Sequence, residues 1–216
     1  TPGVFAGQVE FMEPESGNAQ MRAPFIPVTL TAPSATPTTV WYYTVNGSAQ
    51  AVGSGGDYRQ FGTPSSPRSV TIPAGKTTTW IQPPVFDDDL VEGTETFSVV
   101  ISSLSGGAAY LGNASTTVDI LDADSVASSG KPILTVTGGR QYEGNSGSRV
   151  SPVRLELSKP ATETVKVVCT SVAGTALAGR DFKQSSKTFN LAPGSTGGTF
   201  EAPVYANTPA NADRSY

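Results

Sequence analysis

The chain has 216 residues and a formal net charge of −4. Its 23 glycines, 17 prolines and 15% charged residues are typical of short strands joined by tight turns, and they exclude a protein built from long helices. The sequence contains no histidine, which excludes Ser-His-Asp and Cys-His catalysis and every zinc site that needs imidazole.

Several short segments alternate between apolar and polar side chains, which is the pattern of half-buried strands. In the first half of the chain these segments are residues 26–30, 40–45, 97–101 and 116–120. Turn sequences such as Asn46-Gly47 and Pro73-Ala74-Gly75 separate them. No apolar run approaches the roughly 18 residues of a transmembrane helix, so we expect no membrane span.

Residues 125–131 are mostly small and polar, which is the composition of a linker, and a new strand pattern begins directly after them. We therefore predict a first domain over residues 1–124, a linker over residues 125–131 and a second domain over residues 132–216. Charge divides at the same place. Residues 1–124 carry 12 acidic and 4 basic side chains, a net charge of −8, whereas residues 125–216 carry 6 and 10, a net charge of +4.

The two predicted domains match each other in sequence, which indicates that one structural unit is used twice. The matched segments, first half to second, are 28–30 to 153–155, 56–58 to 180–182, 72–75 to 191–194 and 84–86 to 203–205. The last two pairs share a constant offset of 119 residues.

The second copy is shorter than the first. About 38 residues follow Phe86 in the first copy, whereas 11 follow Tyr205 in the second. We therefore predict an all-β chain of two tandem immunoglobulin-like antiparallel β-sandwiches, the second lacking its last two strands. Either the chain is a fragment of a longer array, or a neighbouring subunit donates the strands, because an open sheet edge accepts another strand.

Nine of the 18 acidic residues lie between Asp57 and Asp124, mostly at the ends of predicted strands. The run Asp87-Asp88-Asp89 follows one strand while Glu92 and Glu95 precede the next, so these groups share one rim of an antiparallel sandwich. Carboxylates about 4 Å apart repel by roughly 1–4 kcal/mol per pair. The rim is therefore either a calcium site, since calcium prefers hard oxygen ligands, or a solvated acidic loop.

The first unit resembles a Calx-beta domain, a calcium-binding sandwich found in sodium/calcium exchangers, adhesion receptors and bacterial surface proteins. The resemblance spans the unit and rests on five segments in order: residues 13–17, 47–49 with 56–58, 73–77, 87–97 and 120–124. The resemblance implies bound calcium, Ca2+. By this resemblance the calcium ligands are Glu13, Asp57, Asp87, Asp88, Glu92, Glu95, Asp122 and Asp124, with Asp89 assisting.

The second unit resembles the same family at Glu143 and Asp181. At the positions 119 residues after Asp87–Asp89, Glu92 and Glu95, however, it has no acidic residues. The replacements are Asp87-Asp88-Asp89 by Ala206-Asn207-Thr208, Glu92 by Asn211 and Glu95 by Arg214. We predict no calcium site in this unit, and an ion pair between the remaining carboxylates and Arg214. The acidic rim of the first unit then explains the division of charge.

The leading prediction is a non-catalytic, calcium-stabilised structural or adhesive module of an extracellular surface protein or filament. Its expected partners are other copies or repeats of the same protein. The opposite charges of the two units favour head-to-tail contact, and in one alternative the protein is a polymer subunit completed by strand donation. Catalysis by paired carboxylates is disfavoured, because a calcium-loaded carboxylate is a poor proton donor.

A second alternative is a glycan-binding accessory module of a secreted enzyme, or a module with another cell-surface partner. Its stacking surface would come from Trp41, Tyr42, Tyr43, Tyr58 and Trp80, although aromatic residues at strand positions more often belong to the core. Nucleic acid is not expected as a partner, because the basic residues are scattered singly.

Overall fold

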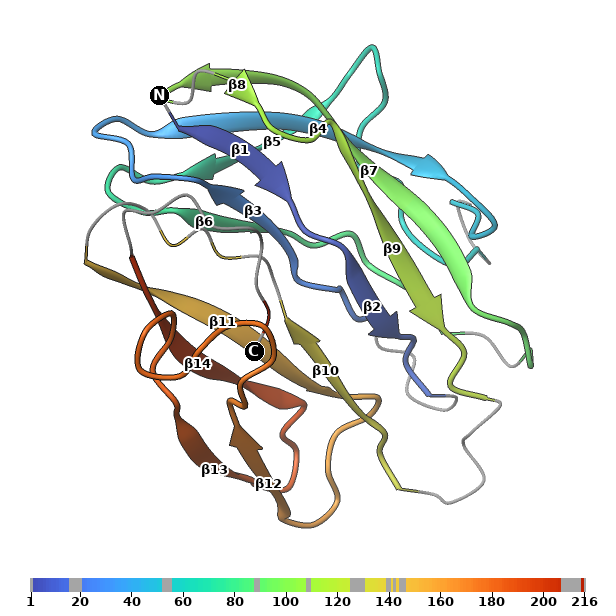
Figure 1. Cartoon of the computed structure of the whole chain (residues 1–216). Helices are drawn as coiled ribbons and strands as arrows, with labels where there is room; N and C mark the ends of the chain where they lie inside the picture. The colour runs from blue at the N-terminus through green and yellow to red at the C-terminus, as the bar shows by residue number, and fades with distance from the viewer. Residues whose placement is uncertain are drawn as a thin grey trace.

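The fold is that of a computed structural model, which describes residues 2–15, 21–51, 56–87, 90–107, 110–124, 131–138, 141, 143, 147–206 and 215. Every regular element in these ranges is a β-strand, and none of them holds a helix that could cross a membrane. The strands form two units that follow one another along the chain (Figure 1). The prediction of an all-β protein is confirmed.

The first unit is a sandwich of two sheets. One sheet has the strand order β6-β3-β1-β8, and the other has the order β2-β9-β7-β4-β5. Only Gly7 and Gln8 separate β1 from β2, so the chain passes from one sheet to the other there. The strands are β1 Gly3–Ala6, β2 Val9–Met12, β3 Ile26–Leu30, β4 Thr38–Asn46, β5 Arg68–Ile72, β6 Thr78–Ile81, β7 Glu95–Gly106, β8 Tyr110–Leu111 and β9 Ser115–Leu121.

Inward-facing side chains of both sheets fill the first unit. Strands β4 and β9 alternate between buried and more exposed positions, as their sequences predicted, so each contributes one face to the core. Within this core, the fully buried rings of Tyr58 and Phe97 stack with their centroids 4.0 Å apart. Other buried side chains around them include Val4, Phe11, Ile26, Leu30, Ile72, Ile81 and Val118.

The second unit repeats five strands of this plan, the counterparts of β1, β3, β4, β5 and β6. Its strands are β10 Leu134–Gly138, β11 Ser148–Leu157, β12 Val165–Thr170, β13 Ser186–Leu191 and β14 Gly197–Tyr205. One sheet has the order β10-β11-β14, and β12 pairs with β13 in the other. Within the described part of this unit, no strand corresponds to β7 or β9, in agreement with the predicted fold class. Residues 125–130 lie outside the described residues, so the domain boundary stays a prediction.

The same backbone hydrogen bonds recur in both units. Leu30 donates its N–H to Thr77 O at 2.7 Å, and Leu157 donates its N–H to Thr196 O at 2.8 Å. Leu30 therefore corresponds to Leu157, and the sequence alignment of residues 28–30 with 153–155 was wrong by two positions. The error has a simple cause, because a shift of two residues along a strand leaves every side chain on its original face.

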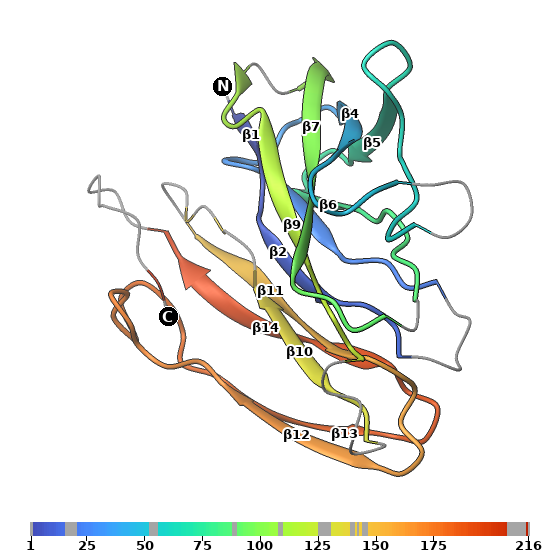
Figure 2. The ribbon, with the colours of Figure 1, turned by 90° about the vertical axis from the view of Figure 1, so that its right-hand side faces the viewer.

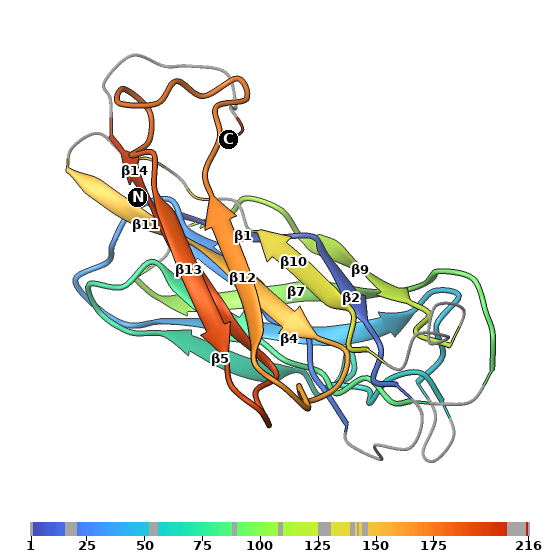
Figure 3. The ribbon, with the colours of Figure 1, turned by 90° about the horizontal axis from the view of Figure 1, so that it is seen from below.

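One face of the β10-β11-β14 sheet lies against the first unit, and the β12-β13 sheet lies on the far side (Figures 2 and 3). Among the described residues, two side chains of the second unit donate to backbone carbonyls of the first: Thr137 Oγ1 donates to Glu10 O at 3.1 Å, and Arg149 Nη1 donates to Thr31 O at 2.7 Å. The two units are therefore in direct contact.

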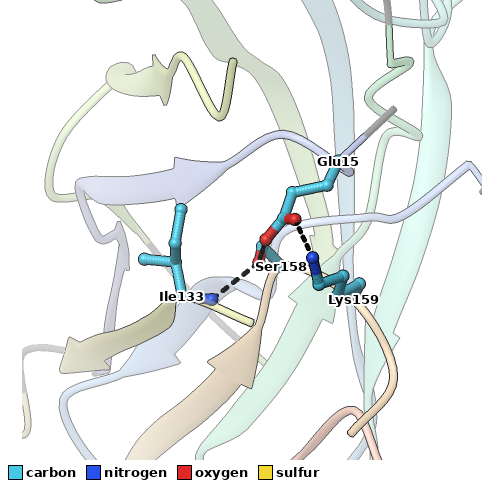
Figure 4. Close-up of polar contacts among 4 residues, drawn as sticks. All are labelled: Glu15, Ile133, Ser158 and Lys159. Atoms are coloured by element: carbon cyan, nitrogen blue, oxygen red, sulfur yellow. Dashed lines mark hydrogen bonds and ion pairs between the residues drawn. The ribbon is translucent and has the colours of Figure 1, made fainter. Parts of the chain in front are cut away.

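Glu15 makes the most buried polar contact between the units (Figure 4). Its carboxylate accepts hydrogen bonds from Ser158 Oγ and from Lys159 Nζ. Ser158 Oγ in turn accepts the backbone N–H of Ile133 at 2.8 Å. The contact links the segment after β2 to the first and second strands of the second unit, and it removes a carboxylate and an ammonium group from water together.

We expect Glu15→Gln to lower the free energy of unfolding by about 2–4 kcal/mol, because Lys159 then keeps its charge at a site shielded from water. Adding Lys159→Met should recover part of that loss. Urea denaturation measures both effects. Lys166→Met, which removes an exposed lysine on β12, is the control and should change the free energy by less than about 0.5 kcal/mol. Equal effects of the control and Glu15→Gln would contradict the interpretation.

Candidate metal centre

Three strand ends meet at one end of the first sandwich. Strand β2 runs parallel to β9 with Met12 opposite Leu121, so the residues that follow these strands lie side by side. Strand β7 runs antiparallel to β9 with Glu95 opposite Ile120, so the segment before β7 reaches the same end. The pairing therefore brings acidic residues together from three separate places in the sequence.

The first carboxylate group consists of Glu13, Asp122 and Asp124, all half-buried, with one oxygen of each within 4.8 Å of the others. The backbone holds these side chains in place. Ala123 donates its N–H to Glu13 Oε1 at 2.9 Å, and Asp124 donates its N–H to Asp122 Oδ1 at 2.7 Å. These hydrogen bonds stabilise the ionised form of each acceptor.

The second carboxylate group consists of Asp57, Glu92 and Glu95, again with one oxygen of each within 4.8 Å of the others. Asp57 Oδ2 accepts the N–H of Gln50 at 2.6 Å, which fixes the aspartate beside the stacked core rings. Glu92 also donates its N–H to Asp122 Oδ2 of the first group at 2.9 Å. The two groups are therefore neighbours.

The structure thus places six of the nine predicted ligands in two groups. Asp87 is described but belongs to neither group, although its Oδ1 atom is buried. Asp88 and Asp89 lie outside the described residues. The assignment of all nine as ligands stays a prediction.

Each group suits calcium. Carboxylates at this separation repel by roughly 1–3 kcal/mol per pair, depending on the effective dielectric. Calcium binds oxygen ligands at about 2.3–2.6 Å, so oxygens up to about 4.8 Å apart can surround one ion. The donors are carboxylate oxygens alone, which disfavours zinc and other metals that prefer nitrogen or sulfur.

The second unit has an aspartate, Asp181, at the position of Asp57, but its charged partner is an arginine instead of other carboxylates. Asp181 Oδ2 accepts the N–H of Leu177 at 2.8 Å, as Asp57 does from Gln50, and Asp181 Oδ1 accepts from Arg180 Nε at 3.0 Å. The hydrogen bond from Leu177 and the charge of Arg180 lower the pKa of Asp181. The sequence predicted Arg214 in this role. Arg214 lies outside the described residues, and the observed partner of Asp181 is Arg180, the adjacent residue in the chain, which the comparison of the two halves did not identify.

The offset of 119 residues extends to Ser215. Ala49 donates its N–H to Thr96 O at 2.9 Å, and Ala176 donates its N–H to Ser215 O at the same distance. Gly47 and Gly174 precede these contacts, and a Cβ atom on either would lie 2.4 or 2.7 Å from the facing carbonyl oxygen. Ser215 therefore occupies the position that Thr96 has near the start of β7. Within the described part of the second unit, no three metal-ligating side chains gather.

The aromatic residues considered for glycan stacking do not form one surface. Tyr42 and Tyr58 belong to the core of the first unit. Trp41, which is exposed, and Tyr43, which is half-buried, lie on the face of β4 that points away from the core, while Trp80 packs edge-on against Phe25. The glycan-binding alternative receives no support from this arrangement.

A family model described as the Calx-beta domain matches residues 6–124 and 135–209. The solved apo-form Calx CBD1 domain is 23% identical, with a TM-score of 0.45 over 57% of this chain and 98% of that chain. CBD12 from CALX1.2 is 18% identical, with a TM-score of 0.45 over 93% of this chain and 76% of that chain. These scores are low, so the fold assignment rests on strand topology. No curated protein matches the sequence.

Asp181 should make the second unit sensitive to acid. Its folded-state pKa lies below the ordinary value of 3.8, so its stabilisation is complete above about pH 5 and is lost as the pH falls through the lowered pKa. In the Asp181→Asn variant, the melting temperature measured by calorimetry should therefore fall less between about pH 5 and pH 2 than it does in the parent protein. Glu163→Gln, at an exposed carboxylate, should follow the parent. Parallel curves for all three proteins would rule out this role.

Proposed function

Because the chain belongs to the Calx-beta domain family, we propose that its first unit binds calcium and that the chain is a non-catalytic structural module stiffened by the ion. The observation that supports this most strongly is the meeting of six carboxylates in two adjacent groups. Such a cluster is destabilising while its charges are uncompensated, and a divalent cation reverses the sign of that energy.

The two groups divide the proposed ligands. Glu13, Asp122 and Asp124 would hold one ion, with Ala123 N–H and the backbone of the strand ends keeping them in register. Asp57, Glu92 and Glu95 would hold the other. Calcium supplies positive charge that ties the ends of three strands together, so the ion acts on stability and stiffness rather than on a reaction.

We place this module outside the cell, in an adhesive or surface protein or a filament. Calcium modules in extracellular proteins have Kd values of about 0.1–1 mM, which millimolar external calcium fills. The proposed ligands fit that range, because Glu92 is exposed and the other five are only half-buried. Other copies or repeats of the same protein are the proposed partners.

Calcium should raise the melting temperature of the first unit. At ten times Kd the gain is about 1.4 kcal/mol, or a few degrees for a domain of this size, because the ion binds the folded state alone. Calorimetry with calcium and with a chelator measures the shift, and titration calorimetry measures the binding.

Asp122→Asn and Glu95→Gln test the two groups separately, because each amide keeps the shape of the carboxylate and removes its charge. Each variant should lose at least about tenfold in calcium affinity at its own group. The matched control is Asp119→Asn on β9, whose carboxylate bonds Gln8 at 3.2 Å and belongs to neither group. A melting temperature that is the same with calcium and with chelator would overturn the proposal.

Strand donation is a second candidate, supported by the open edge of β12. In the first unit the corresponding strand β4 pairs with both β5 and β7, whereas β12 pairs only with β13 within the described residues. Leu134 and Val136 lie opposite the buried Leu157 and Leu155, so they share a sheet face with the core, and both are exposed. A strand added beside β12 would cover this face.

If a second copy supplies that strand, the chain should form dimers or larger species whose amount rises with concentration. Light scattering coupled to size-exclusion chromatography measures this. Val168→Lys places a charge at the exposed edge and should return the protein to monomer, because edge charges oppose strand pairing. Val168→Thr is the control and should leave assembly unchanged. Monomer at every concentration for the parent chain would exclude donation between copies.

A further inference from the structure

A pocket of about 420 Å³ lies between the two units. Arg22, Phe25 and Gln82 line it from the first unit, and Arg154, Glu156 and Ser158 line it from the second. Ser158 also belongs to the Glu15 contact between the units (Figure 4). Its volume lies in the range of small-molecule sites.

Arg154 is fixed in place but incompletely hydrogen-bonded. Its guanidinium lies 3.8 Å from the centroid of the Phe25 ring, and its Nη1 donates to Thr199 Oγ1 at 2.7 Å. Its Nε is buried and has no hydrogen-bond partner in the structure. A buried donor without an acceptor is costly, so a ligand oxygen at this atom would be stabilising.

The guanidinium N–H groups of Arg22 are available to bond a ligand. Among the described residues, its guanidinium makes no hydrogen bond and no ion pair, and its nearest aromatic ring is Phe11 at 5.9 Å. Burial lowers the pKa of Arg22, and the charge of Glu156 partly offsets that effect. A second guanidinium with unused N–H groups therefore lies on the same pocket as Arg154.

Glu156 adds an acceptor to this pair of donors. It is buried, and its closest basic atom is Arg154 Nη2 at 4.0 Å, which is beyond hydrogen-bonding distance. Burial raises the pKa of Glu156, and the two arginines lower it. Two guanidinium groups and one carboxylate give these three side chains a net charge of +1. The complementary ligand is a monoanion that also carries hydrogen-bond donors.

We propose that this pocket binds a sugar acid, a hydroxylated monocarboxylate such as a hexuronate. The ligand carboxylate would bond Arg22 and Nε of Arg154, and ligand hydroxyls would donate to Glu156 and bond the exposed amide of Gln82. A neutral sugar can accept hydrogen bonds from the guanidinium groups but carries no charge to balance theirs, and a simple carboxylate offers no donor to Glu156. The site uses none of the six clustered carboxylates, so it is independent of the proposed calcium function.

Titration calorimetry of the full chain with sodium D-glucuronate, D-glucose and sodium acetate tests the proposal. Glucuronate should bind saturably, and the other two should bind at least about tenfold more weakly. Glucuronate binding should persist in chelator, which separates it from calcium bridging. Tighter binding of a short oligouronate would identify a polysaccharide end as the source, and equal binding would identify the free sugar acid.

Arg22→Gln should weaken glucuronate binding at least about tenfold, and the matched control Arg68→Gln should not, because Arg68 lies on β5 against Phe61. Gln82→Ala is a second pocket variant. Because the Gln82 side chain is exposed, its removal should leave the fold intact, and it should weaken glucuronate binding severalfold. The proposal fails if glucose matches glucuronate, if no saturable binding occurs, or if both pocket variants bind as the parent does.

Discussion

The repulsion among carboxylates at one end of the first sandwich is the constraint on which its design depends. Parallel pairing of β2 with β9 places Glu13 beside Asp122, and antiparallel pairing of β7 with β9 brings Glu92 and Glu95 to the same end. The sheet hydrogen bonds that stabilise the sandwich therefore also concentrate its negative charge. The strand pairing fixes the backbone positions of these residues, so a cation bound among their carboxylates would relieve the repulsion with the fold intact.

The second unit shows which part of this arrangement belongs to the fold itself. Asp57 and Asp181 accept equivalent backbone hydrogen bonds, from Gln50 and Leu177, so both aspartates hold the same loop. In the second unit Arg180 neutralises the charge locally. The aspartate is thus a structural residue in both copies, and it joins a metal-type cluster only where other carboxylates come near.

Local sequence signals could predict the strands, the repeat and most of the acidic end. Alternation marks β4, β7 and β9, as predicted, whereas β3 is buried at all five positions instead of alternating. The connection between consecutive strands fixes which loops share a rim. Alternation could not fix the match of Leu30 to Leu157, since a two-residue shift preserves it. It also could not identify Arg180 as the partner of Asp181 or Lys159 as the partner of Glu15, because side-chain pairing depends on tertiary geometry that a pattern does not contain.

The contact between the units changes the meaning of the charge division. From the sequence, the acidic rim alone explained why one unit is negative and the other positive. In the structure, Glu15 lies two residues after Glu13 in the sequence but forms an ion pair with Lys159 of the second unit instead of joining the carboxylate groups. Arg22 of the first unit lies close enough to Glu156 of the second for their charges to interact. Pro14 between the two glutamates lines the pocket. One short segment therefore serves the metal-type cluster, the pocket and the unit contact, and part of the opposite charge is neutralised within the chain itself.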